Sequence, residues 1–309
     1  MPRTLPLSLI DFSTVYPGQS GHDAIATSVT LAQRAEGHGF RRVWYAEHHN
    51  AADRASSVPA VLIAHIGAKT NTIRLGAGGV MLPNHAPYSI AEQFGTLAEM
   101  YPGRIDLGLG RAPGTDAKTV GRALRRPYDA SDNFPQDVVE LDHYLKGSSQ
   151  IPGVQAYPGA GTNVPVYILG SSMYGATLAA ALGLPYAFAS HFASQHLADA
   201  VAYYREHFTP SVEWAEPYVL AGVNVIAAET ETAAQEKYDE VLAKRMRRHG
   251  PRARTTLRFA GVGTGEQAAG YLEEFAEKAR ADELLINFEG ATPEQARDSL
   301  DSFAPAWEL

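Results

Sequence analysis

The amino-acid sequence predicts an α/β fold in which eight parallel strands close into a TIM (β/α)8 barrel. Short apolar runs alternate with segments of helical periodicity eight times along 309 residues. Strict alternation implies parallel strands with right-handed crossovers, and eight units of this length is the number in such a barrel. Polar residues and glycines also gather where the strands end, on the face that carries chemistry in barrels. A doubly wound sheet is the competing fold.

The first half of the chain supplies four strands and three regular helices. The strands are expected at residues 5–12, 42–46, 73–80 and 105–109, each an apolar run bounded by turn residues. The helices are expected at residues 22–38, 58–69 and 88–100, and Gly39 ends the first of them.

The second half is less regular at first. Residues 119–126 and 135–145 have helical spacing, and residues 147–164, with four glycines and two prolines, predict a loop. Strands are then expected at 165–170, 186–189, 218–228 and 283–288, and helices at 174–182, 195–208, 229–248, 266–281 and 293–303. No change in composition marks a boundary, so residues 1–309 are expected to form a single domain with insertions after the fourth and seventh strands.

The composition excludes several classes of protein. The formal charge of −8 argues against broad nucleic-acid binding, which needs a basic face. No run approaches the roughly 18 uninterrupted apolar residues of a membrane helix. The chain has no cysteine, which excludes disulfides, thiolate metal sites and a cysteine nucleophile. The expected compartment is the cytoplasm.

The residues at the strand exits predict a ligand-binding face. In chain order they are Glu47-His48-His49, Gly78-Gly79, Gly110-Arg111, Ser171-Ser172 and His191. Neighbouring strand residues point to opposite sides, so at most one of His48 and His49 faces the barrel mouth. That divergence makes the pair a poor metal site, and no carboxylate cluster or His-Glu-x-x-His motif supports one, so no metal is expected. For the inward histidine, a catalytic role and a purely structural role both stay open.

The other exits also have two interpretations each. The two glycines at 78 and 79 form either a plain turn or a backbone surface on which a flat ring can lie. The serines at 171 and 172 are either a helix cap or the start of a helix whose N–H groups bind an anion. Arg111 either shares that anion, such as a phosphate, or forms a surface salt bridge.

These residues resemble the bacterial-luciferase-like flavin monooxygenase family. The resemblance runs nearly end to end and rests on residues 46–49, 73–83, 103–114 and 169–172. Residues 111–116, Arg-Ala-Pro-Gly-Thr-Asp, are similar to a subgroup of single-chain members whose substrates are mostly unassigned. The resemblance implies a luciferase-like TIM barrel that binds reduced FMN. It also implies a homodimer formed through the helices at 58–69 and 88–100.

The resemblance assigns a role to each strand exit. His48 matches the catalytic histidine, and Gly78–Gly79 matches a non-prolyl cis peptide under the flavin ring. Arg111 matches the phosphate-binding arginine, and Ser171 with Ser172 match the phosphate-binding helix start. His191, at the sixth strand exit, is grouped with the cofactor-binding residues.

Three departures from the family pattern stand out. Gly110 occupies the place of the reactive cysteine of luciferases, so light emission is not implied. Phe134 stands where a second phosphate-contacting basic residue is expected, with Arg122, Arg125 or Arg126 as substitutes. The lid after the seventh strand is abbreviated, and residues 250–265 are its candidate.

The chemistry implied by the resemblance is a monooxygenation. Reduced flavin reacts with O2 to a C4a-hydroperoxide, which acts on a small apolar carbonyl or similar organic substrate while His48 acts on a proton. A separate flavin reductase is expected to supply the reduced FMN, because no nicotinamide motif is visible. Two alternatives stay open: a deazaflavin (F420)-dependent hydride-transfer oxidoreductase, and a flavin-binding protein without turnover.

Overall fold

Eight parallel strands form a closed barrel in the computed structural model, which describes residues 5–127, 129–193 and 195–307. The barrel strands are hydrogen-bonded in chain order, and pairing of the last with the first closes the ring. They are β1 (Leu7–Asp11), β2 (Arg42–Tyr45), β3 (Arg74–Met81), β4 (Ile105–Gly110), β5 (Val166–Gly170), β6 (Tyr186–Phe188), β7 (Val219–Ala227) and β9 (Glu283–Phe288). The predicted TIM (β/α)8 barrel is confirmed.

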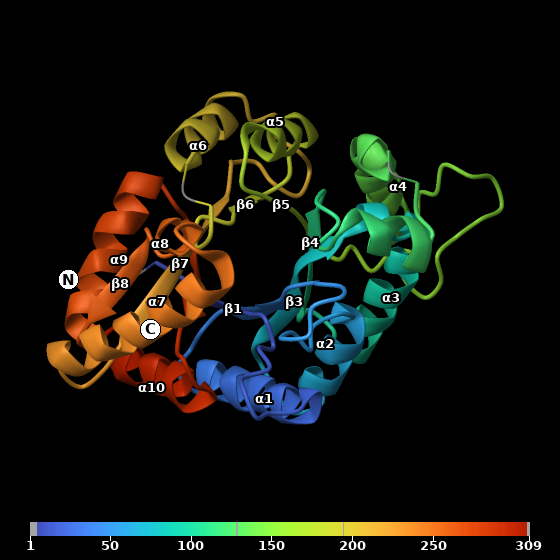
Figure 1. The fold of residues 1–309 in the computed structure, drawn as a ribbon. Helices are drawn as coiled ribbons and strands as arrows, with labels where there is room; N and C mark the ends of the chain where they lie inside the picture. The colour runs from blue at the N-terminus through green and yellow to red at the C-terminus, as the bar shows by residue number, and fades with distance from the viewer. Residues whose placement is uncertain (1–4, 128, 194, 308–309) are drawn as a thin grey trace.

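Helices surround this ring of strands on the outside, as Figure 1 shows. The main ones are α1 (Gly21–Gly37), α2 (Pro59–Gly67), α3 (Pro87–Met100), α4 (Phe134–Leu145), α5 (Met173–Leu182), α6 (Leu197–Glu206), α7 (Glu231–His249), α9 (Gly265–Ala279) and α10 (Pro293–Phe303). Side-chain caps set several of their starts. Ser20 and Asp23 form a capping box at α1, and Thr292 accepts from the Gln295 N–H at α10.

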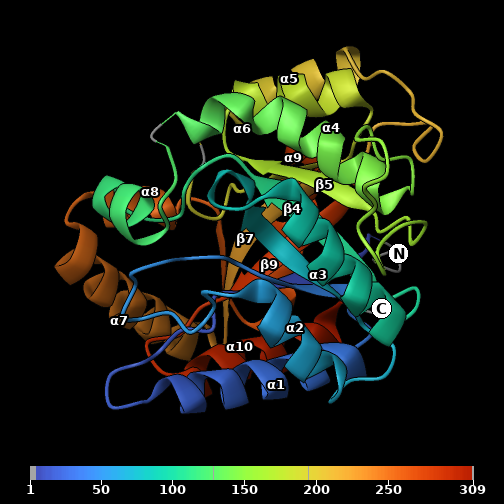
Figure 2. The ribbon, with the colours of Figure 1, turned by 90° about the vertical axis from the view of Figure 1, so that its right-hand side faces the viewer.

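The segment after β7 contains two elements that the sequence did not predict. Residues 250–265 hold a short helix, α8 (Arg252–Thr256), and a ninth strand, β8 (Ala260–Gly263). The Ala-Gly-Val-Gly run is too short and too rich in glycine to show strand periodicity. It becomes a strand by pairing with β7 residues 224–227, beyond residues 219–221 where β6 pairs. In the side view of Figure 2, α8 and α7 lie at the same end of the barrel.

The insertion after β4 is also less helical than its spacing suggested. The predicted helix at 119–126 is only a π-helical turn, Thr119–Ala123, followed by 3₁₀ turns at Ala130–Asn133 and then α4. A second 3₁₀ turn, Leu82–Asn84, follows β3, and another, Ala304–Ala306, ends the helix region.

The inside of the barrel is filled in layers by side chains from alternate strand positions. A buried polar layer at the strand starts contains Arg42, Asp106 and Glu283. Above it lies an apolar layer made of Ile10, Trp44, Tyr167, Ala187, Leu220 and Leu285. Trp44 needs glycine opposite it, because a Cβ on Gly76 would lie 2.7 Å from the indole nitrogen. The filled lower layers leave space for a ligand only toward the strand ends.

Within the described parts of the chain, none of the helices combines the length and the apolar character that a membrane span requires.

Candidate active site

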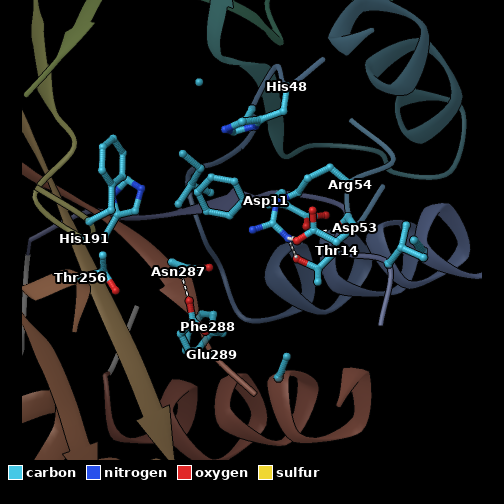
Figure 3. Close-up of a pocket in the computed structure, with 18 of the residues that line it drawn as sticks. Asp11, Thr14, His48, Asp53, Arg54, His191, Thr256, Asn287, Phe288 and Glu289 are labelled. Carbon is cyan, nitrogen blue, oxygen red and sulfur yellow. Dashed lines mark hydrogen bonds and ion pairs between the residues drawn. The ribbon is translucent and has the colours of Figure 1, made fainter. Parts of the chain in front are cut away.

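A cavity of about 1010 Å³ opens at the carboxyl ends of the strands. Its wall comes from the exits of β1, β2, β3, β6 and β9 and from α1, α7 and α8. Three predicted site residues line it, namely His48, Gly78 and His191. Figure 3 shows His48 on one side of this cavity and Asn287, Phe288 and Glu289 on the other.

His48 is the member of the histidine pair that faces the cavity. Its Nδ1 atom is buried and has no hydrogen-bond partner among the described residues. Burial lowers its pKa, and the nearby positive charge of Arg54 lowers it further. His48 is therefore neutral at neutral pH, so it can accept a proton there.

His191 and His48 both lie near the ring of Phe12. The Phe12 ring centre is 5.9 Å from the His48 ring centre and 5.8 Å from that of His191. His191 is 2% exposed, and neither ring nitrogen has a partner among the described residues. Burial lowers its pKa to about 3, so it is a neutral imidazole. Its free nitrogens leave it able to hydrogen-bond a ligand in the cavity.

The peptide bond between Gly78 and Gly79 is cis. Gly78 lines the cavity, and Trp44 packs directly beneath it, because a Cβ on Gly78 would lie 2.9 Å from the Trp44 Cβ. The two glycines thus present bare backbone above a filled barrel core. That surface suits a flat ring, and the flavin contact predicted for it stays a prediction.

Arg111, Ser171 and Ser172 lie together at the start of α5, outside the cavity lining. The Arg111 guanidinium stacks on Tyr174, in the first helical turn, with Cζ 3.9 Å from the ring centre. Ser172 is the N-cap residue, and its side chain makes no capping hydrogen bond. An exposed arginine beside a free helix start has the charge and donors that a phosphate requires. Ala112 and Leu169, close in sequence to this group, line the cavity and connect the two places.

Comparison with known proteins identifies the family. The family model described as luciferase-like monooxygenase matches residues 8–306. This chain belongs to the luciferase-like monooxygenase family. An Escherichia coli (strain K12) luciferase-like monooxygenase is 50% identical over 234 residues, which are 75% of this chain and 70% of the relative. The uncharacterized Bacillus subtilis (strain 168) protein YvbT is 41% identical over 325 residues, covering 98% of this chain and 96% of YvbT.

A solved structure supports the same assignment. The crystal structure of apo-MsnO8 superposes with a TM-score of 0.90 at 31% identity, covering 99% of both chains. These comparisons leave open the substrate of this member of the luciferase-like monooxygenase family.

His49 points away from the cavity and joins a buried carboxylate. The Nε2 atoms of His49 and His85 lie 2.7 Å and 2.8 Å from Glu47 Oε1, and the Met81 N–H donates to Glu47 Oε2 at 3.1 Å. Burial alone would raise the Glu47 pKa, but these hydrogen bonds lower it to about 2. An ionised Glu47 therefore anchors the segment that carries His48.

Glu47, His49 and His85 place a carboxylate beside a histidine of the pair, which the sequence analysis did not expect. Their ligand atoms all lie within 4.8 Å of one another, so the donor set of a transition-metal site is present. The sequence analysis found no carboxylate support for the histidine pair, because His85 is distant in sequence. Both imidazoles are already satisfied by Glu47, so we interpret the cluster as a hydrogen-bonded triad.

Sequence reasoning missed the charged residues of this luciferase-like cavity. Five basic side chains line it, namely Arg54, Lys244, Arg245, Arg248 and Arg252. Arg245 pairs with Glu289, and both Arg54 and Arg248 pair with Asp53. A signal for the α7 members was available, since Lys244, Arg245 and Arg248 share one helix face after the seventh strand.

Arg252 and Thr256 line the cavity, so α8, which belongs to the lid candidate at residues 250–265, forms part of its wall.

Arg126, one of the residues proposed as a second phosphate contact, is engaged elsewhere. Its Nε donates to the Pro83 carbonyl at 2.9 Å.

Proposed function

We propose that this protein is a flavin-dependent monooxygenase that uses reduced FMN and O2 on an organic substrate. The observation that carries the proposal is one cavity that combines the unpartnered His48 with the bare Gly78–Gly79 backbone. Membership of the luciferase-like monooxygenase family supports it. So does a Bacillus subtilis (strain 168) relative, 34% identical over 284 residues, named N-acetyl-S-alkylcysteine monooxygenase.

The residues present fit FMN in two places. The Arg111 guanidinium and the start of α5 offer charge and N–H donors to its phosphate. The backbone at Gly78–Gly79 offers a flat surface to its ring system. Ala112 follows Arg111 in sequence and Leu169 precedes Ser171 by two residues, and both line the same cavity as Gly78. When bound, the flavin would supply the activation of O2 and the oxygen transfer, which no side chain can supply.

The side chains of the chain itself would handle protons and water. His48, neutral because burial and Arg54 lower its pKa, would accept a proton from the substrate or cofactor. Phe12, Leu169 and Ala189 give the cavity apolar wall beside it and would limit the access of water.

The deazaflavin F420 is the alternative cofactor. Two solved structures of this fold differ in what they bind. The oxygenating constituent of 3,6-diketocamphane monooxygenase, 15% identical with a TM-score of 0.76, is in complex with FMN. A secondary alcohol dehydrogenase, 17% identical with a TM-score of 0.72, is F420-dependent. At these identities the likeness shows the fold alone, so titration must decide.

We expect the protein to bind reduced FMN and Arg111→Ala to weaken that binding about 10- to 100-fold, since it removes a charge-assisted contact to phosphate. Riboflavin, which has no phosphate, should bind both proteins equally well. Fluorescence titration with FMN, reduced FMN, riboflavin and F420 measures this. Lys278→Ala, which removes an exposed cation on α9 outside the cavity lining, is the control and should leave FMN binding unchanged. Binding of F420 alone would replace the monooxygenase proposal by hydride transfer, and binding of flavin without O2-dependent turnover would favour a non-catalytic role.

We also propose that a separate reductase supplies the reduced flavin.

The protein is further proposed to form a homodimer through α2 and α3. Val58 and Val61 at α2 are 53% and 67% exposed, which leaves an apolar surface uncovered. Light scattering is expected to give about twice the 33.3 kDa chain mass. Val61→Glu should give the single-chain mass, because it places a charge in the interface. Val212→Glu, at a fully exposed loop position, should leave the dimer intact; a monomeric wild type would disprove the proposal.

A further inference from the structure

The cavity has a side lobe between α1 and α7, beside the ends of β1 and β9. Each helix contributes four residues spaced i, i+3, i+4 and i+7, so each presents one continuous face to the lobe. They are Ala24, Thr27, Ser28 and Leu31 from α1, and Val241, Lys244, Arg245 and Arg248 from α7. Phe288 and Glu289, at the end of β9, lie across the cavity from His48 in Figure 3. The site chemistry described above uses none of these residues.

The basic residues of the lobe differ in how they are neutralised. Arg245 forms an ion pair with Glu289, and Arg248 forms one with Asp53. No carboxylate lies within ion-pair distance of Lys244 in the described parts of the chain. Its Nζ lies 4.2 Å from the Tyr16 ring centre and 3.5 Å from the Ala291 carbonyl oxygen.

The environment of Lys244 makes the absence of a carboxylate partner unfavourable in free energy. The side chain is half-buried, and burial lowers its pKa. Glu289 acts in the opposite direction, but its carboxylate is already engaged by Arg245 and Asn287. A half-buried ammonium whose neighbours are an aromatic ring and a carbonyl oxygen, but no carboxylate, loses hydration without a compensating ion pair. A bound anion would supply that missing partner.

The rest of the lobe is suited to an uncharged chain. Leu31, Val241 and Phe288 form apolar wall around the cationic end, and Ala24 and Ala296 add to it. Toward the barrel the wall continues to Phe12, whose ring lies near both His48 and His191. A molecule lying along this path has its charged end at Lys244 and its apolar body near the cis peptide and His48.

We propose that the lobe binds the anionic end of the acceptor substrate, which is therefore an amphipathic acid, a carboxylate or a sulfonate with an apolar body. The inference rests on the proposed function, because it treats this cavity as the place where the substrate is oxygenated. In this proposal Lys244 determines substrate specificity by binding the acid group, and His48 contacts the apolar part of the substrate.

Binding of matched probes tests the inference without turnover. Calorimetric titration of the full chain saturated with FMN is done with octanoate, octanesulfonate and octanamide, which share an apolar chain. We expect octanoate or octanesulfonate to bind at least about tenfold more tightly than octanamide, and their relative affinities identify the acid group. Lys244→Met should remove the difference and leave octanamide binding unchanged. Lys244→Arg should retain most of it.

Two controls make the result decisive. Arg247→Met changes an exposed cation on the same helix that does not line the cavity, and it should retain the preference for the acids. Equal affinity for acids and amide in the wild type, or no binding of any probe, overturns the inference. So does weaker binding of FMN but not riboflavin by Lys244→Met, because Lys244 would then contact the cofactor phosphate. If the protein fails to bind FMN, the same titration on the flavin-free chain still decides the lobe, whereas the proposed function fails.

Discussion

Replacing His48 by alanine is expected to reduce kcat for substrate oxygenation by about 100- to 10,000-fold, the range contributed by a positioned acid–base group. The flavin should bind nearly as well as in the wild type, because the predicted phosphate contacts, Arg111 and the start of α5, are separate from the cavity lining. Single-turnover oxidation of bound reduced FMN, with product analysis, separates the two effects. The variant should still consume O2 but release peroxide in place of product.

The pH dependence supplies a second readout for His48. Its pKa lies below the usual value of about 6.5, so the neutral imidazole persists as the pH falls toward that value. The acidic limb of kcat/KM should therefore fall below about pH 6.5 and vanish in His48→Gln. His22→Ala, outside the cavity at the start of α1, is the control. Oxygenation that persists in both His48 variants would show that another group carries the proton.

The barrel could be predicted because its pattern is local. Every barrel strand is a short buried run, and Gly39, Gly103 and Pro165 mark turns beside three of them. Alternation along β2 also explains why Arg42 and Trp44 both face inward. The strand β8 could not be predicted because its pattern is not local. Residues 260–263 form a strand by pairing with β7, which is distant in sequence. Such pairing leaves no periodic pattern in residues 260–263 themselves.

The site could be predicted only where function depends on the strand exits themselves. His48, Gly78 and His191 lie around one cavity, as the shared face of parallel strands requires. Arg111 and Ser172 meet through Tyr174, a contact that no spacing rule reveals. The hydrogen-bonded triad of Glu47, His49 and His85 could not be predicted, because His85 follows a different strand. The cations of α7 could not be predicted from the strand pattern either, because they lie on a helix. When a helix follows a long connection, the sequence separation between its residues and the residues that they contact is not fixed, so sequence spacing does not predict the contact.

The second large effect expected concerns stability at the opposite end of the barrel. Arg42 is fully buried, and its Nη1 donates to Asp106 Oδ2 and to the Tyr167 hydroxyl, both at 2.8 Å, while Nη2 donates to Glu283 Oε2 at 3.1 Å. Burial alone would lower its pKa, but the two carboxylates outweigh burial and raise it. Arg42→Met should lower the free energy of unfolding by about 3–5 kcal/mol, because it leaves both carboxylates buried without their shared partner. Urea denaturation followed by far-UV circular dichroism measures the loss.

A double variant distinguishes two causes of the stability loss in Arg42→Met, namely the missing positive charge and the changed side-chain packing. Adding Glu283→Gln to Arg42→Met removes a buried charge whose remaining partners are the Tyr218 and Ser8 hydroxyls and the more distant Arg41, so the double variant should regain part of the stability. Arg297→Met breaks only a surface pair with Glu294 on α10 and should cost less than about 1 kcal/mol. If the stability losses of Arg42→Met and Glu283→Gln, each measured against the wild type, simply add in the double variant, the guanidinium acts through volume and not through charge. Recovery would instead show that the polar layer is a compensated ion network beneath Trp44, on which the packing of the active-site end depends.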